Sequence, residues 1–159
     1  MNSEDVLRYL DVPFRFTERA TPIAPQHRIV WGLSAVILIL HYCCRSGRSS
    51  LQRLHVLYWA LKSKQHQKDL LDALNGLLRP EIVLVRYDPA LNRAVDYAIA
   101  ENLIEALDKG RVQLTSAGNA MARQIVEARD TLVDEKRFLS TLGTIPTENL
   151  IRQLTKGSS

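Results

Sequence analysis

The sequence predicts a mainly α-helical domain with a small β-hairpin. Two observations predict this class. Apolar residues recur at spacings of three and four in several segments, and residues 103–114 form two β-prone runs around Gly110. The chain has 159 residues, of which 46% are hydrophobic and 24% charged, as in soluble globular proteins. With seven Gly, six Pro and two Cys, collagenous, disordered and disulfide-framework proteins are excluded.

The first 44 residues predict an arm followed by a central helix. Residues 1–27 contain three prolines and little periodicity, which predicts an extended arm with a short helix near its start. Residues 28–44 are hydrophobic nearly all round, as in a helix at the centre of a domain. A bilayer span needs about 20 apolar residues, so we expect a buried core helix. Gly47, in the break after it, suits a helix C-terminus.

Two further helices and a short strand are predicted next. Ser50 caps a helix that runs to about Lys62, with apolar residues on one face. A leucine stripe predicts another helix over about 65–78. The β-branched run at residues 82–85 predicts a short strand.

The second half of the chain predicts a helix, a hairpin and more helices. Asp88 and Pro89 are a helix cap and first residue, and that helix runs to about Asn102. The hairpin comprises residues 103–107, a turn at 108–110 and residues 111–114. Thr115 or Ser116 then caps a helix that continues towards Leu132. This order is that of a winged helix-turn-helix over residues 28–132, between an arm at 1–27 and a helical tail at 133–159.

Positive charge is concentrated in the middle of the chain. The net charge is +4, but residues 29–86 carry eight Lys or Arg against three acidic residues. Such a bias is compatible with a phosphate-facing surface, but the excess is modest and slightly favours a solvated face with incidental charge. With the two cations of the wing, the candidate nucleic-acid contacts are Arg45, Arg48, Arg53, Lys62, Lys64, Lys68, Lys109 and Arg111.

The helix in the DNA-recognition position is acidic. Residues 88–105 contain one arginine, Arg93, against four Asp or Glu. Phosphate attraction supplies much of the affinity of DNA-binding proteins, so this charge argues against an ordinary sequence-specific regulator. The alternative use of the fold is as a subunit that docks on partners. Leu150, Ile151 and Leu154 in the tail, together with the arm, are the candidate docking segments, unless they pack on their own domain.

The sequence carries no recognised catalytic or cofactor motif. It has no Gly-x-x-x-x-Gly-Lys loop and no nucleophile elbow, and its four His are scattered. Asp130, Asp134 and Glu135 are interpreted as a solvated face rather than a Mg²⁺ site, and Trp31 and Trp59 as core residues. We therefore predict a protein that is not an enzyme, with no cofactor and no metal. The adjacent cysteines and a polar N-terminus predict a cytoplasmic protein.

Several blocks resemble a family of bacterial accessory proteins. They comprise Arg28–Leu40, Arg48–Leu54, Tyr58–Leu61 and Val85–Ala94. Over roughly residues 25–125, the chain is similar to the middle components of bacterial ABC-three-component systems, of which Lamassu antiphage defence is the best-known type. The resemblance implies a winged-helix subunit that works beside an SMC/Rad50-like ABC ATPase and an effector, often a nuclease. It supplies no catalytic motif to carry over to this sequence. As further partners we expect the DNA backbone, contacted through the complex, and no membrane. The alternative is a dimeric winged-helix transcription regulator.

Overall fold

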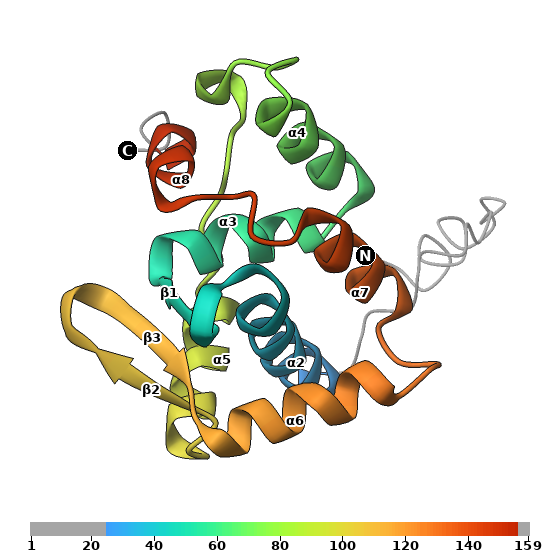
Figure 1. The fold of residues 1–159 in the computed structure, drawn as a ribbon, viewed down its shortest axis with the longest axis vertical. Coiled ribbons are helices and arrows are strands. Elements are labelled where there is room, and N and C mark those ends of the chain that lie inside the picture. Colours follow the sequence, from blue (N-terminus) through green and yellow to red (C-terminus); the bar gives the residue numbers. More distant parts are fainter. Residues whose placement is uncertain (1–24, 156–159) are drawn as a thin grey trace, which may run out of the picture.

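The computed structural model describes residues 25–155 as one mainly helical unit (Figure 1). Residues 1–24, which make up most of the expected arm, lie outside the described range. The elements, in chain order, are α2 (Pro25–Cys43), η1 (Arg45–Gly47), β1 (Arg48–Ser50), α3 (Leu51–Leu61), α4 (Lys64–Leu74), η2 (Pro80–Ile82), α5 (Pro89–Ala100), β2 (Ile104–Leu107), η3 (Asp108–Gly110), β3 (Arg111–Leu114), α6 (Ser116–Glu127), α7 (Val133–Leu142) and α8 (Glu148–Thr155).

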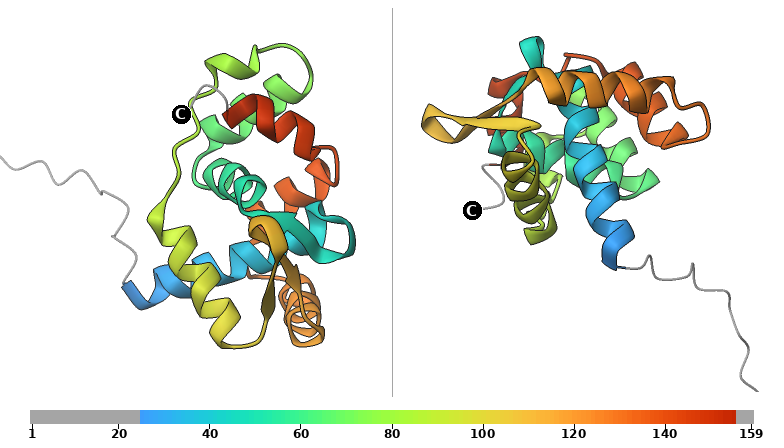
Figure 2. Two further views of the ribbon diagram at one scale, coloured as in Figure 1. Left: turned by 90° about the vertical axis from the view of Figure 1, so that its left-hand side faces the viewer. Right: turned by 90° about the horizontal axis from the view of Figure 1, so that it is seen from below.

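Helix α2 is the centre of the fold, as its all-round hydrophobicity predicts. It contacts α3, α5, α6 and α7, which lie around it (Figure 2). Residues 35–40 are almost completely buried. Gly32 brings α2 close to α5, because a Cβ there would already touch Ala94 and the Tyr58 hydroxyl at 3.4 Å. None of the helices within residues 25–155 is both long and apolar enough to cross a membrane.

Local capping signals place three helix starts where they are predicted. The side chain of Ser50 accepts a hydrogen bond from the Arg53 amide, and Asp88 accepts one from the Ala90 amide. Thr115 accepts one from the amide of Gly118. A Cβ on Gly118 would lie 2.0 Å from the carbonyl oxygen of Leu103, so only glycine lets α6 start against the hairpin.

The predicted hairpin is confirmed and belongs to a three-stranded antiparallel sheet. Strands β2 and β3 pair around a turn in which Lys109 and Gly110 both have positive φ. Strand β1 pairs with the other side of β3, which gives the order β1-β3-β2. The sequence analysis missed β1, because three polar residues carry no strand pattern and depend on β3 for their hydrogen bonds.

Three predicted boundaries are wrong. Residues 82–85 form no strand: Ile82 ends η2, and the residues after it are extended without a paired strand. The helix predicted over 65–78 ends at Leu74. The helix predicted to continue to Leu132 ends at Glu127, and Leu132 takes a left-handed conformation before α7.

The C-terminal helices belong to the same core. Leu139 and Leu142 of α7 and Ile151 and Leu154 of α8 join one hydrophobic cluster with α2 and α3. The helices with the small three-stranded sheet are compatible with a winged-helix-like layout.

Candidate interaction surfaces

The eight candidate nucleic-acid contacts divide into three groups. Arg45, Arg48, Lys109 and Arg111 lie on η1, β1, η3 and β3, and all four are exposed. Lys62, Lys64 and Lys68 lie at the far end of α3 and on α4, about one helix length, or roughly 16 Å, from β1. Arg53 lies inside the molecule.

The first group lies on and beside the sheet, and we call Arg45, Arg48, Lys109 and Arg111 the basic sheet face. The register also places the exposed Glu105 of β2 opposite Gln113, so this face is not purely basic. Strand pairing aligns Arg48 with Gln113, and the Arg48 guanidinium donates to the Gln113 side chain at 3.3 Å. Arg111 donates to the carbonyl of Asp108 at 3.3 Å. Within residues 25–155 none of the four forms an ion pair, so their charges face solvent.

The lysines of the second group are less available to contact a nucleic acid. Lys62 forms an ion pair with Asp88, and Lys68 forms one with Asp72 at 2.7 Å, one helical turn away. Burial lowers the pKa of Lys62, and its ammonium also lies 5.5 Å from the ring centroid of Tyr58. Lys64 is exposed at the start of α4. These three residues do not continue the basic sheet face.

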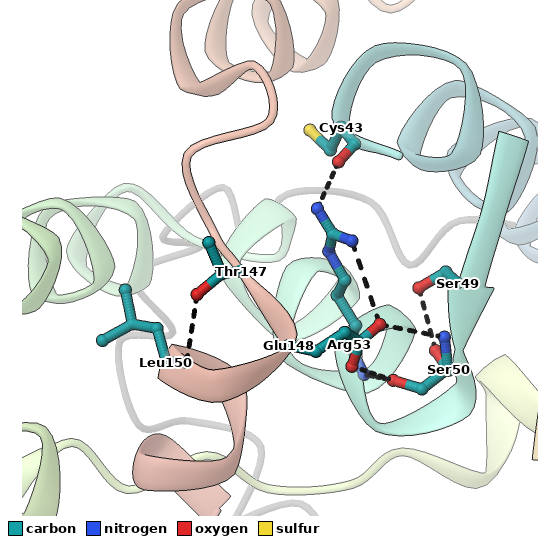
Figure 3. Close-up of polar contacts among 7 residues, drawn as sticks. All are labelled: Cys43, Ser49, Ser50, Arg53, Thr147, Glu148 and Leu150. Atoms are coloured by element: carbon teal, nitrogen blue, oxygen red, sulfur yellow. Dashed lines mark hydrogen bonds and ion pairs between the residues drawn. The ribbon is translucent and has the colours of Figure 1, made fainter. Parts of the chain in front are cut away.

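Arg53 is a structural residue, which corrects its prediction as a nucleic-acid contact. It is 8% exposed, and its guanidinium donates to the carbonyl of Cys43 at the end of α2 (Figure 3). A second nitrogen lies 3.8 Å from Glu148 of α8. The Glu148 carboxylate also accepts from the Ser50 hydroxyl at 2.7 Å and from the Ser50 amide at 3.2 Å. This network ties α8 to the α2–β1–α3 junction.

The tail residues predicted to dock on a partner are mostly inside the domain. Ile151 and Leu154 have no exposed surface, and Leu150 is half-buried with its amide bonded to Thr147. An eight-residue helix is marginal on its own, so packing on α3 and η2 provides its stability. Their prediction as a docking surface is wrong for this conformation, because the core of the chain already occupies the apolar face of α8.

A groove between α2 and α5 was not predicted from the sequence. It has a volume of about 900 Å³, and residues of α3 and α7 also line it. Its lining combines aromatic, aliphatic and charged side chains: Arg28, Ile29, Trp31, Tyr58, Leu61, Lys62, Asp88, Ala90, Arg93, Ala94, Tyr97 and Glu135. We call this set the α2–α5 groove.

Three aromatic side chains, Trp31, Tyr58 and Tyr97, are among the lining residues of the groove. Trp31 and Tyr58 meet edge to face with ring centroids 5.3 Å apart. The Trp31 indole donates to Glu135 of α7 at 3.3 Å, so its orientation is fixed. Tyr97 is 46% exposed, and beside the groove Ile29 and Val30 are 50% and 61% exposed. Trp31 is thus only partly a core residue, contrary to its interpretation from the sequence.

The two acidic side chains of the groove have ion-pair or hydrogen-bond partners, whereas two of its arginines form no ion pair within residues 25–155. Asp88 is held by Lys62 and by its role as a helix cap, and Glu135 accepts from Trp31. Arg28 and Arg93 are exposed and form no ion pair within residues 25–155. Burial raises the pKa of the Tyr58 phenol, and the nearby charge of Arg93 opposes the shift. The groove therefore offers aromatic surface beside two available guanidinium groups.

The cysteines and histidines are dispersed through the fold. Burial raises the pKa of Cys43 to about 12 and also raises that of Cys44, which makes both thiols poor nucleophiles. His41 is exposed whereas Cys44, three residues on, is buried, so they do not face each other. Across residues 25–155 the structure brings no three His, Cys, Asp or Glu side chains together as metal ligands.

Comparison with protein-family models, with curated proteins and with solved structures gave no match. The surfaces just described are therefore the basis for a functional proposal.

Proposed function

We propose that this chain is a non-enzymatic winged-helix accessory subunit of the cytoplasm, which bridges an SMC/Rad50-like ABC ATPase and an effector nuclease in bacterial antiviral defence. The observation that carries the proposal is the α2–α5 groove, an aromatic surface beside the helix that DNA-binding members of the fold use for base contacts. The residue blocks quoted above supply the ATPase and the effector as expected partners.

The order of elements supports the winged-helix assignment and also argues against ordinary DNA docking. Helices α2, α3 and α5 with strands β1, β2 and β3 follow the winged-helix order. A DNA-binding helix-turn-helix joins its last two helices by a short turn, whereas residues 62–88 and the helix α4 lie between α3 and α5. The exposed face of α5 also carries Asp96, with Glu101 at its end. Both features favour a protein partner at α5.

The chemistry of the groove indicates the kind of partner segment. Tyr, Trp and Arg are the residue types that dominate binding energy at protein interfaces. Trp31 and Tyr97 can receive an aromatic or aliphatic anchor, while Arg28 and Arg93 can pair with carboxylates. We therefore expect an amphipathic, acidic segment of the ATPase or the effector, bound as a helix in a groove.

Co-expression with an SMC-like ATPase encoded by a neighbouring gene tests the proposal. We expect a stable complex in size-exclusion chromatography with light scattering. Truncating an exposed aromatic hot spot costs about 2 kcal/mol, so Tyr97→Ala should weaken binding roughly thirtyfold. Asp96→Ala is the matched control, because Asp96 is exposed on the same helix but does not line the groove. The proposal would be contradicted if the chain formed no complex with the ATPase, or if the two variants bound the ATPase equally well.

A dimeric winged-helix regulator remains the second candidate, on account of the basic sheet face. Four cations around β1 and β3, which form no ion pair in the described part of the chain, can contact phosphates. If they do, Arg111→Glu should abolish DNA binding and reduce its salt dependence, while Lys64→Glu, far from the sheet, should leave both nearly unchanged. Unaltered DNA binding by Arg111→Glu would remove this candidate.

A further inference from the structure

The α2–α5 groove has a definite chemical requirement for whatever fills it. Arg28 at the start of α2 and Arg93 in α5 are exposed, and neither forms an ion pair within residues 25–155. The third cation of the groove, Lys62, is already paired with Asp88. Ile29, which is 50% exposed, adds apolar surface to the same lining. A segment that fills the groove therefore needs carboxylates beside apolar side chains.

The arm that precedes α2 contains a segment with the required charge. Residues 4–11 carry three acidic side chains against one arginine, Arg8. The groove carries three cations against two acidic side chains. The two therefore have complementary charge.

The apolar residues of the same segment have the spacing of a helix that binds in a groove. Val6, Leu7 and Leu10 fall on one face at helical spacing. Glu4 comes three residues before Leu7 and Asp11 four residues after it, so in a helix both carboxylates lie beside that apolar face. This is the amphipathic, acidic chemistry that the groove requires.

The chain attaches this segment next to the groove. Helix α2 begins at Pro25, and Trp31 of the groove lies about 9 Å further along the helix. On the other side, the groove follows α5 from Ala90 to Tyr97, or about 10 Å. Helices α2 and α5 lie side by side (Figure 2). Residues 12–24 can span up to about 43 Å, which is more than enough for residues 4–11 to reach every part of the groove.

Tethering favours this segment over a separate molecule. A short connection gives a linked segment an effective concentration of the order of 1 mM at its site. A segment that binds with a dissociation constant of about 0.1 mM when separate would then occupy the groove about nine-tenths of the time. A partner must bind more tightly to replace it.

We propose that residues 4–11 of the same chain occupy the α2–α5 groove in the free protein, with their carboxylates paired with Arg28 and Arg93. The occupant is the arm because its segment has the complementary charge and the apolar face and is tethered at the start of α2. As an autoinhibitory contact the inference rests on the proposed function, since the arm covers the surface that the ATPase or effector would use. The occupancy itself requires no partner.

Tryptic cleavage of the full chain after Arg8 tests the occupancy. Cleavage requires the arm to leave the groove, so its rate should be about tenfold lower than in a synthetic peptide of residues 1–24. Arg93→Glu should release the arm and raise the rate nearly to that of the peptide. Arg123→Glu is the matched control, because Arg123 is exposed on α6 and does not line the groove, and it should keep the low rate.

A second variant and a fold measurement keep the result unambiguous. Arg28→Glu should raise the rate as Arg93→Glu does, and circular dichroism shows whether each variant is folded. Cleavage of the unaltered chain at the rate of the peptide would show that the arm is not held, and would overturn the proposal. Slow cleavage that is equal in the groove variants and in Arg123→Glu would show that the arm is held elsewhere, and would overturn it too.

The complex with the ATPase tests the autoinhibitory contact separately. If the ATPase displaces the arm, cleavage after Arg8 in the complex should rise to the rate of the peptide. Failure to form a complex would count against the proposed function alone, because the tryptic test of the free chain still decides the occupancy. A complex in which Arg8 stays protected would overturn the autoinhibitory contact.

Discussion

Two apolar regions of this protein differ in whether the fold covers them. The amphipathic tail helix α8 is predicted either to dock on a partner or to pack on its own domain, and Ile151 and Leu154 are fully buried in the core. The start of α2 is predicted as core, yet Ile29 and Val30 are half or more exposed beside the α2–α5 groove. Hydrophobicity alone does not separate a surface that is already covered from one that is available. Whether an apolar residue is covered depends on whether another helix or strand of the fold packs against it.

The largest expected effect compares one isoleucine from each region. Ile151→Ala removes a fully buried side chain and should lower the free energy of unfolding by about 2–5 kcal/mol. Ile29→Ala, at a side chain that is 50% exposed, should change it by roughly 0.5 kcal/mol or less. Urea denaturation followed by circular dichroism measures both. Equal losses would contradict the division of the two regions.

A smaller effect is expected from the network that ties α8 to the core. Glu148→Ala removes the ion-pair partner of the buried Arg53, which keeps its hydrogen bond to the Cys43 carbonyl, and it removes the acceptor of the Ser50 hydroxyl (Figure 3). We expect a loss of about 1–3 kcal/mol in the free energy of unfolding, because hydrogen bonds to charged groups contribute this much. Glu127→Ala, at an exposed residue that ends α6, is the control and should be nearly neutral. A neutral Glu148→Ala would show that apolar packing alone holds α8.

The smallest of the three expected effects on stability is its dependence on pH. Burial lowers the pKa of His55 below its ordinary value of 6.5, so the unfolded chain binds a proton more readily than the folded chain. Stability should therefore be full above pH 6.5 and should fall as the pH drops through 6.5 towards the folded-state pKa. Urea midpoints at about pH 7.5 and about pH 5.5 measure the decline.

A variant isolates the contribution of His55. His55→Phe keeps an aromatic ring against Tyr87 but cannot titrate, so it should flatten this part of the pH profile. His41→Gln, at an exposed histidine, serves as the control and should retain it. An unchanged profile in His55→Phe would assign the pH dependence to other groups.

Elements with local signals were predictable from the sequence. Asp88 followed by Pro89, the cap residue Thr115 and the glycine turn at 110 each depend on residues within one turn of the chain, and the structure agrees with all three. Elements that depend on distant partners were not. Strand β1 exists because β3 pairs with it, while residues 82–85 carry a strong strand pattern and pair with nothing in the described structure.

The surfaces were harder to predict than the elements. Arg53 counts as a surface cation in any sequence analysis, because its burial depends on Glu148 and the Cys43 carbonyl, both remote in sequence. The α2–α5 groove combines residues of four helices, so no local pattern could reveal it. The one sequence feature that points to the groove is the start of the apolar run in α2. This run begins at Ile29 and Val30, which are exposed, before the buried residues of the helix.

Hydrogen exchange of the protein alone and in complex with the co-expressed ATPase tests the central claim most directly. The account predicts new protection at the start of α2 and along α5, with α8 equally protected in both states because its apolar face is already buried. Protection gained in α8 while α2 and α5 stay unchanged would contradict it, and would restore the tail as the docking element.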